Sequence, residues 1–316
     1  MTTAPAPQPA QGAGFSHLIA LQDPTGSADW GDARAGQICR GLEVGDIVFF
    51  PSSPIVISTE DRELLLGRKQ SSSAYHKNIA YRPSEDRVTG LDASEQAEAA
   101  ELKRILRDYS QRSVEFLSRF LIPYAGKWKL DYASFRPVEE EGRAVRLHAR
   151  NDLLHFDSFP TRPTNGGRIL RFFTNINPRQ NRVWLTSQTF EAFGPHFATT
   201  AGLLSSFHNP LSRGLRSIAR TLHIPGADRP PYDELMHRCH NAMKEDATFQ
   251  ETTPKHRWEF PPNSSWMVFT DCVSHAVLSG QYALEQTFLI PQSALVDAQR
   301  SPLAILENLA GNSLTV

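Results

Sequence analysis

Several features are scarce in this 316-residue sequence, and each scarcity excludes a class of protein. The sequence has no run of about 18 apolar residues, which is the length that a helix needs to cross a bilayer. Its net charge of −1 creates no field that would attract nucleic acid. Cysteine occurs only at Cys39, Cys239 and Cys272, an odd and widely spaced set. This usage predicts a reducing compartment and no disulfide framework.

The first residues lack both the basic start and the apolar stretch of a secretory signal. Residues 1–14 are instead rich in proline, alanine and glutamine, and we expect them to form a disordered tail. Together with the cysteine usage, this start predicts a cytoplasmic protein.

Residues 15–142 mix strand-like and helix-like patterns, and we predict an N-terminal α/β region. In its long expected helix, acidic residues follow Ser94, where they complement the positive end of the helix dipole, and Pro123 ends the pattern. The apolar residues of this helix share one stripe, which indicates a face packed on a core. The expected strands of this region are 15–21 and 46–51.

From residue 143 onward the pattern changes to short strands separated by Pro, Gly and Asn clusters. Apolar residues alternate with arginine and histidine over 143–150, with the period of a strand. We therefore predict a mainly β protein with α elaborations, whose core at 143–292 is a double-stranded β-helix (jelly-roll or cupin-like), followed by a C-terminal extension at 293–316. Further expected strands are 168–176, 182–187, 265–271 and 284–290.

A helical insertion is predicted near residues 189–257 of this core. Its clearest helix covers 210–222, where leucine and isoleucine share one face and Arg213, Arg216 and Arg220 share the opposite one. One interpretation is a helix packed on the core with a solvated basic face. The other is a docking surface for an anionic lipid or sugar.

Three residues of the predicted core have the composition of a non-haem iron site. His155 and Asp157 are separated by one residue, so in a strand their side chains point the same way and Phe156 points away. His275 lies in an apolar, strand-like run at 269–277. Two imidazoles and one carboxylate would occupy half of an octahedron around Fe(II) and leave the other half open. The alternative is that His155 and Asp157 form an ordinary surface pair.

Longer blocks around these residues resemble a known family. The blocks are HFDSFPTRPTNGGRILRFFTNINP, WMVFTDCVSHAVLSGQYALEQTFLIP and the preceding RPVEEEGRAVRLHARNDLL. Over about residues 45–291 the chain is similar to the Kdo hydroxylases. The resemblance implies an Fe(II)- and 2-oxoglutarate-dependent dioxygenase that uses O₂ to hydroxylate the 3-position of 3-deoxy-manno-octulosonic acid (Kdo) in Kdo-lipid A of the lipopolysaccharide inner core. It also implies that His155, Asp157 and His275 are the iron ligands.

The same resemblance implies a Kdo-containing lipid A precursor as the partner. We therefore expect a cytoplasmic enzyme that meets the inner face of the inner membrane peripherally, with residues 210–222 contacting anionic lipid. No nucleic-acid partner is expected. Two alternatives stay open: a non-catalytic jelly-roll carbohydrate-binding protein whose metal is structural, and a protein hydroxylase of the same superfamily.

The far carboxylate of 2-oxoglutarate needs a cationic anchor. In many oxygenases of this superfamily an arginine about ten residues after the distal histidine provides it. The corresponding run, QYALEQTFLI, offers Gln281 and Gln286 but no arginine or lysine. Arg168 and Arg171 are the expected replacements, and strand alternation predicts that only one of them points inward. We favour Arg171, with Asn175 as a neighbouring donor; the alternative for either arginine is a structural ion pair.

The sugar acid also carries negative groups, and arginine is concentrated around the first two ligands. Arg162 follows Asp157 closely and is the residue that we expect to reach a sugar acid beside the iron. Arg150, Tyr75 and Lys77 are weaker candidates for substrate binding. The alternative for all four is a solvated surface position.

The run His237-Arg238-Cys239-His240 raises the question of a second metal site. Adjacent ligands of this kind rarely form such a site alone, and no partner pair has the usual zinc spacing. We interpret the run as the surface of a helix or loop.

Overall fold

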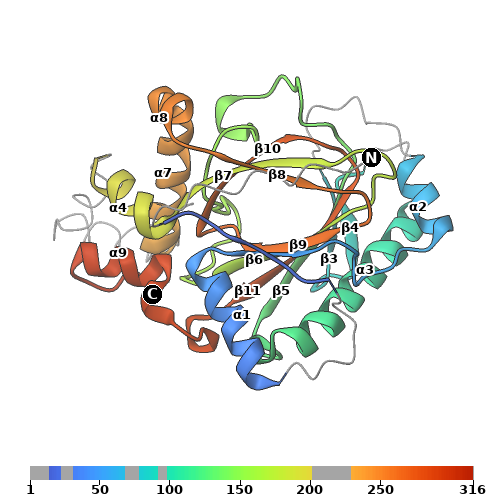
Figure 1. Cartoon of the computed structure of the whole chain (residues 1–316), viewed down its shortest axis with the longest axis horizontal. Coiled ribbons are helices and arrows are strands. Elements are labelled where there is room, and N and C mark those ends of the chain that lie inside the picture. The colour runs from blue at the N-terminus through green and yellow to red at the C-terminus, as the bar shows by residue number, and fades with distance from the viewer. Residues whose placement is uncertain (1–13, 23–30, 68–77, 92–97, 201–228, 316) are drawn as a thin grey trace, which may run out of the picture.

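The structure, a computed structural model, describes residues 14–22, 31–67, 78–91, 98–200 and 229–315. Two β-sheets lie face to face, with helices on the outside of the larger sheet and at one end of both (Figure 1). No helix in these ranges is long and apolar enough to cross a membrane.

The larger sheet has eight strands, and all of its neighbouring pairs are antiparallel except β1 and β2. β5 comes before residue 142, where a domain boundary was expected, and it pairs with β11, which comes near the C-terminal end of the chain. One sheet therefore contains strands from both sides of the expected boundary. The sequence analysis did not predict β3, β4 or β5. In spatial order the strands are β1 (Leu18–Ala20), β2 (Ile47–Phe50), β9 (Ser265–Phe269), β6 (Arg168–Asn175), β11 (Ala283–Ile290), β5 (Lys129–Arg136), β3 (Ile79–Arg82) and β4 (Arg87–Thr89).

The smaller sheet has three antiparallel strands, in the order β10 (Val273–Ser279), β7 (Arg182–Thr189) and β8 (His256–Phe260). A single antiparallel bridge joins His155 to His275 of β10. The segment around His155 therefore lies beside β10 at the edge of this sheet. The strands predicted at 168–176, 182–187, 265–271 and 284–290 are confirmed, with small shifts at their ends.

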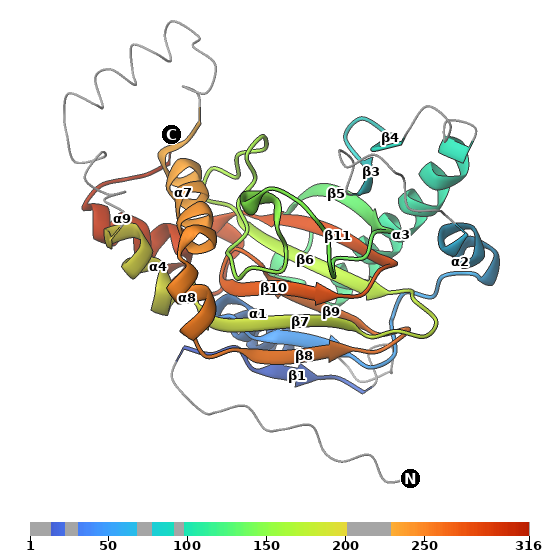
Figure 2. The ribbon, with the colours of Figure 1, turned by 90° about the horizontal axis from the view of Figure 1, so that it is seen from above.

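The helices lie outside the larger sheet and at the ends of the molecule (Figure 1). α4, α7, α8 and α9 gather at one end of the molecule, whereas α1 and α3 cover the larger sheet (Figures 1 and 2). The α-helices are α1 (Asp32–Val44), α2 (Thr59–Leu66), α3 (Ala99–Phe120), α4 (Phe190–Thr200), α7 (Pro231–Glu245), α8 (Ala247–Thr252) and α9 (Pro302–Ala310). Short 3-10 helices are η2 (Ile122–Tyr124), η3 (Leu147–Ala149), η4 (Gln292–Ala294) and η5 (Ala298–Arg300).

The alternation of side chains along β6 separates two parts of the core. Phe172 points outward to α3, where the ring of Phe116 lies 6.0 Å from its own. Phe173 points between the sheets, where its ring lies 5.0 Å from that of Trp184 and 5.1 Å from that of Trp266. Odd-numbered residues of β6 therefore face the space between the sheets, and even-numbered residues face the helices.

The predicted long helix is present, although its observed start differs from the predicted one. α3 begins at Ala99, and Ser94 lies outside the described residues. The apolar stripe is confirmed, because Leu102, Leu106 and Phe120 are among its buried residues.

The strand expected at 143–150 is wrong. This segment is coil that contains η3, and Leu147 is 43% exposed. An alternating pattern needs a neighbouring strand for its backbone hydrogen bonds, and this segment pairs with no strand of the described chain.

The insertion expected near 189–257 is helical where the structure describes it. α4, α7 and α8 lie between β7 and β8 in the sequence. The predicted helix at 210–222, with its three-arginine face, lies outside the described residues.

Candidate metal centre

The segment that carries His155 and Asp157 is extended and held by backbone hydrogen bonds. The amide of His155 donates to the carbonyl of His275 at 3.1 Å, and the amide of His275 donates back at 3.0 Å. The amide of Asp157 donates to the carbonyl of Thr270 at 2.8 Å. Phe156 points the other way, into the core, with its ring 5.0 Å from that of Phe190. The same-side placement predicted for His155 and Asp157 is therefore observed.

This backbone pairing brings the three predicted ligands together. The ligand atoms of His155, Asp157 and His275 all lie within 4.8 Å of one another, and all three residues are buried. Nε2 of His155 lies 3.7 Å from Oδ1 of Asp157, and Nε2 of His275 lies 3.9 Å from Oδ2. The alternative of a surface pair is excluded by this burial.

Hydrogen bonds on the far side of each ring fix its tautomer. Nδ1 of His155 donates to the carbonyl of Leu153 at 2.7 Å, and Nδ1 of His275 donates to that of Val273 at 2.9 Å. A carbonyl can only accept, so both Nδ1 atoms carry the proton, and both Nε2 lone pairs face the carboxylate. This is the arrangement in which histidine binds a metal through Nε2.

The electrostatics of the cluster favour a divalent cation. Burial, and then the charge of Lys244, hold the pKa of His155 well below its ordinary value, and burial lowers that of His275. Burial alone would raise the pKa of Asp157, but the charge of Arg171, together with electrostatic interactions with His275 and His155, outweighs burial and holds that pKa well below its usual range. Oδ2 of Asp157 is buried and accepts no hydrogen bond from the described residues. Two neutral imidazoles and one ionised carboxylate fit a metal such as Fe(II).

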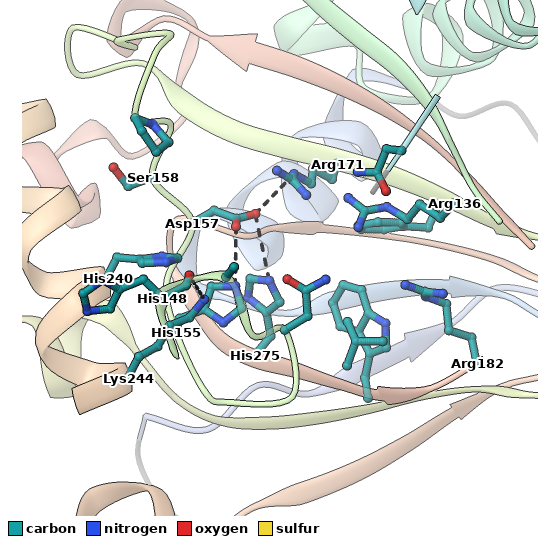
Figure 3. A pocket seen from close by; sticks show the side chains of 17 residues that line it. Arg136, His148, His155, Asp157, Ser158, Arg171, Arg182, His240, Lys244 and His275 are labelled. Carbon is teal, nitrogen blue, oxygen red and sulfur yellow. Dashed lines mark hydrogen bonds and ion pairs between the residues drawn. The ribbon is translucent and has the colours of Figure 1, made fainter. Parts of the chain in front are cut away.

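A cavity of about 400 Å³ lies over the three ligands. Figure 3 shows basic side chains on both sides of them. Arg136, Arg171 and Arg182 line one side, and His148, His240 and Lys244 line the other. A cavity of this size and charge suits small anions that bind next to a metal.

On the arginine side, two guanidinium groups share a buried carboxylate. Nε of Arg171 lies 3.3 Å from Glu285 and 3.2 Å from Asp157. Arg136 donates through Nε to Glu285 at 2.8 Å. Glu285 stands on β11 within the run where an anchoring arginine was sought, and it supplies the opposite charge.

Arg182, at the start of β7, has N–H groups that bind no other described residue. It is 1% exposed, yet it lines the cavity. Its Nη1 donates to the carbonyl of Gly280, whereas Nε and Nη2 have no hydrogen-bond partner among the described residues. Burial, and then the charge of Arg136, lower the pKa of Arg182 to about 10. An arginine in this state favours an incoming anion.

Two of the residues expected to hold 2-oxoglutarate are placed elsewhere. Arg168 is on the helix-facing side of β6, where its Nε donates to Asp271 at 2.8 Å and its guanidinium lies 4.3 Å from the ring of Phe269. The amide nitrogen of Asn175 donates to the carbonyls of Gln180 and Phe260, each at 2.9 Å. Neither lines the cavity. The alternation prediction holds, because Arg171 points inward and Arg168 does not.

Of the four residues expected to bind the sugar acid, the two that the structure describes lie away from the cavity. Arg162 lies between two rings, 3.9 Å from that of Tyr132 and 4.3 Å from that of Phe159, and donates to Asp131 at 3.0 Å. Arg150 is paired with Asp152 on the surface. Neither lines the cavity. Tyr75 and Lys77 lie outside the described residues.

The surface interpretation of the run at 237–240 is wrong for His240. α7 brings this residue to the cavity, where its ring lies 4.8 Å from that of His155 and nearly perpendicular to it. Lys244, one turn later, is buried on the same side of the cavity. No sequence signal separated His240 from its neighbours, because its place depends on how α7 packs against the segment that carries His155.

Comparisons with known proteins match nearly the whole chain. The profile of the 3-deoxy-D-manno-oct-2-ulosonic acid (Kdo) hydroxylase family matches residues 28–313. The chain is similar to the solved Kdo hydroxylase KdoO, a non-haem Fe(II) α-ketoglutarate-dependent dioxygenase. Its complex with α-ketoglutarate and Fe(III) has 31% identity, coverage of 95% of this chain and 98% of that one, and a TM-score of 0.81. The apo structure has 32% identity, the same coverage and a TM-score of 0.82. Among curated sequences no match is found.

Proposed function

The chain belongs to the Kdo hydroxylase family of Fe(II)- and 2-oxoglutarate-dependent dioxygenases, and from this premise we propose that it hydroxylates position 3 of Kdo in a Kdo-lipid A acceptor. The observation that carries the proposal is the buried cluster of His155, Asp157 and His275 at a cavity lined with basic groups. Of the three functions considered from the sequence, the family match favours this enzyme over a carbohydrate-binding protein and a protein hydroxylase.

We further propose that the core is a double-stranded β-helix. Four strands of the larger sheet, in the order β5, β11, β6 and β9, face β10, β7 and β8 of the smaller one (Figure 1). The bridge at His155 supplies a rudimentary fourth strand next to β10. Eight strands in two opposed sheets are the composition of a jelly roll.

His155, Asp157 and His275 are the proposed Fe(II) ligands. The chemistry that Fe(II) supplies there is the oxidation of 2-oxoglutarate by O₂ to succinate and CO₂, with the second oxygen atom entering the sugar as a hydroxyl group. The protein holds both Nε2 atoms unprotonated and the carboxylate ionised, which leaves the ligand set ready to bind a cation.

The arginine side of the cavity is the proposed site for 2-oxoglutarate. Arg182 offers buried donors that the described residues do not use, and Arg136 adds positive charge beside it. Both groups line the cavity that contains the three ligands, so a dicarboxylate bound to the metal at one end would have them as neighbours for its other end. Arg171, which contacts Asp157, holds the carboxylate ligand in place and is no longer our preferred anchor.

The opposite side of the cavity is the proposed site for the sugar acid. His148, His240 and Lys244 line it. The positive charge of Lys244 suits the carboxylate of Kdo, and the imidazole groups suit its hydroxyl groups. These residues replace Arg162 and Arg150 as our candidates for substrate binding.

A lipid-linked acceptor places the proposed reaction at the cytoplasmic face of the inner membrane. The helix at 210–222, which we expected to contact anionic lipid, lies outside the described residues and adds no support from the structure.

The test supplies purified protein with Fe(II), 2-oxoglutarate, O₂ and Kdo-lipid A. We expect succinate to form and the acceptor to gain one oxygen atom by mass spectrometry, with NMR placing the hydroxyl group at C3 of Kdo. The His275→Ala variant and a reaction without 2-oxoglutarate should give neither product. Succinate formation with an unmodified acceptor would contradict the proposed substrate, and oxygen at another carbon would contradict the proposed position.

A further inference from the structure

The segment 154–157, which carries two of the proposed ligands, has a strand partner on one side only. On that side His155 exchanges two backbone hydrogen bonds with His275 of β10. On the other side no strand of the described chain pairs with the segment. On the side of β10, the amide of Asp157 also donates to the carbonyl of Thr270. On the other side, the backbone groups of Leu154 and the carbonyl of Phe156 are bound by side chains from α7 and α8, the helices of the insertion.

Gln250 of α8 takes the place of a neighbouring peptide group. Its Oε1 accepts from the amide of Leu154 at 2.9 Å, and its Nε2 donates to the carbonyl of Leu154 at 2.9 Å. Nε2 also donates to the carbonyl of Met243 at 2.8 Å, which ties the pair to the end of α7. A primary amide has the donor and acceptor of a peptide bond, so this one side chain makes the two hydrogen bonds that an adjacent strand would make.

His240 of α7 holds the next residues along the same edge. Its Nδ1 donates to the carbonyl of Phe156 at 2.7 Å, and this carbonyl lies between the two ligand residues. Its ring lies 4.8 Å from that of His155, at an angle of 72°. The hydrogen bond fixes the rotation of the peptide between Phe156 and Asp157, and the ring contact limits the rotation of the His155 side chain.

We propose that His240 and Gln250 form a clamp that positions His155 and Asp157 for the metal. In this role both are positioning residues, because they act through the ligand segment, and His240 has it in addition to its place at the proposed sugar-acid site. The inference rests on the metal site proposed above and adds a role for the helical insertion. Without the clamp, segment 154–157 keeps its bonds to β10 but gains freedom on its other edge, so the ligands are less often in the geometry that a metal requires. Partners that orient metal ligands typically contribute a factor of about 10–100 to metal affinity.

The experiment is a titration of metal-free protein with Co(II), which the similar KdoO binds in a solved structure. Affinity is measured by calorimetry and by the visible absorption of bound Co(II), with no turnover involved. Circular dichroism and the melting temperature of the metal-free variants separate loss of fold from loss of affinity. We expect His240→Ala and Gln250→Met to remain folded and to bind Co(II) about tenfold more weakly or worse.

A matched pair of substitutions tests the hydrogen bond itself. The amide nitrogen of asparagine stands the same number of bonds from Cα as Nδ1 of histidine, whereas that of glutamine stands one bond further, as Nε2 does. His240→Asn should therefore recover most of the Co(II) affinity that His240→Ala loses, and His240→Gln should recover little. The control is His17→Asn, at an exposed histidine that pairs with Asp46 and does not line the cavity, which should bind Co(II) like the wild type.

Wild-type affinity in folded His240→Ala and Gln250→Met would overturn the clamp, as would equal losses in the asparagine and glutamine variants of His240. The proposed metal site is tested separately by His155→Ala. If that variant kept full Co(II) binding, the metal site would be wrong, whatever the clamp variants did.

Discussion

Nε of Arg171 lies 3.2 Å from Oδ2 of Asp157, so the proposed iron ligand is also half of a buried ion pair. The guanidinium group keeps this carboxyl ionised despite its burial. The guanidinium group of Arg171 also contacts Glu285, and this second ion pair holds the guanidinium group in place. A carboxylate with one face on an arginine and the other toward two imidazoles is oriented before any metal arrives.

Loss of a proposed ligand should remove the metal without unfolding the chain. Asp157, His155 and His275 lie at a cavity, and alanine at any of them removes one donor of the set. We expect each variant to lose bound iron, measured by elemental analysis, and hydroxylation. A chelator should abolish wild-type activity and added Fe(II) should restore it. Retention of iron and activity by His275→Ala would show that the site lies elsewhere.

Arg182→Met should weaken the binding of 2-oxoglutarate. The substitution keeps a long side chain but removes the buried donors at the cavity, and loss of such a fork typically costs about 2–5 kcal/mol, more than tenfold in affinity. Calorimetry on Co(II)-loaded protein measures this affinity directly. The affinity of Arg182→Lys for 2-oxoglutarate should lie between that of Arg182→Met and that of the wild type, because lysine keeps the charge without the planar geometry of the guanidinium group.

Arg179→Met is the control for that experiment, since Arg179 is exposed in the loop before β7. It should bind 2-oxoglutarate like the wild type. If Arg182→Met kept wild-type affinity while Arg171→Met lost it, the anchor would return to Arg171, the residue that we first expected from the sequence.

Arg168→Met should destabilise the protein without changing its affinity for 2-oxoglutarate. Removing one partner of a buried ion pair typically costs about 3–5 kcal/mol, and Asp271 would remain buried. Burial already raises the pKa of Asp271, and removal of Arg168 should raise it further. Because the folded state then holds a proton that the unfolded state releases, stability falls as pH rises from the unfolded pKa through the folded one.

The deficit of Arg168→Met relative to the wild type should therefore be larger at pH 7 than at pH 5, which denaturant unfolding at both values would measure. A deficit independent of pH would mean that Asp271 does not titrate in that range. A loss of 2-oxoglutarate affinity in the folded variant would restore Arg168 as a candidate for the co-substrate site.

Arg162→Lys should loosen the loop that follows Asp157. Its guanidinium group is stacked between Tyr132 on β5 and Phe159 on the loop, and lysine keeps the charge but not the stacking plane. We expect a loss of about 1–2 kcal/mol in unfolding free energy, measured by denaturant titration. Affinity for the sugar acceptor should change little. A large rise in the acceptor concentration needed, with unchanged stability, would support the substrate role that the sequence suggested.

Much of the metal site could be predicted from the sequence because it depends on a local rule. The one-residue spacing of His155 and Asp157 fixes their side regardless of the rest of the fold. The same rule predicted that Arg168 and Arg171 point to opposite faces of β6. The rule alone could not say which arginine points inward. The structure decides this, because Phe172 packs against α3 and Phe173 packs between the sheets, which places Arg171 on the inner face.

The rest of the cavity could not be predicted, because it is built by contacts between distant segments. Arg182 reaches the cavity because β7 pairs with β10, and His240 does so because α7 packs beside segment 154–157. Neither placement leaves a periodic signal near the residue. The segment 143–150 shows the opposite case. It has the alternating pattern of a strand, but no strand of the described chain forms backbone hydrogen bonds with it, so it is not a strand.

The two backbone hydrogen bonds between His155 and His275 join positions separated by about 120 residues of chain, and contacts of such long range are slow to form. The metal site does not exist until β10 has met the segment around His155, so a metal ion cannot accelerate the steps that come before. It binds the finished structure, and its stabilisation grows with the logarithm of the free metal concentration. We expect the metal site to form after the folding transition state, so that bound metal slows unfolding. Loaded and empty chains should fold at the same rate, and the loaded ones should persist longer once folded.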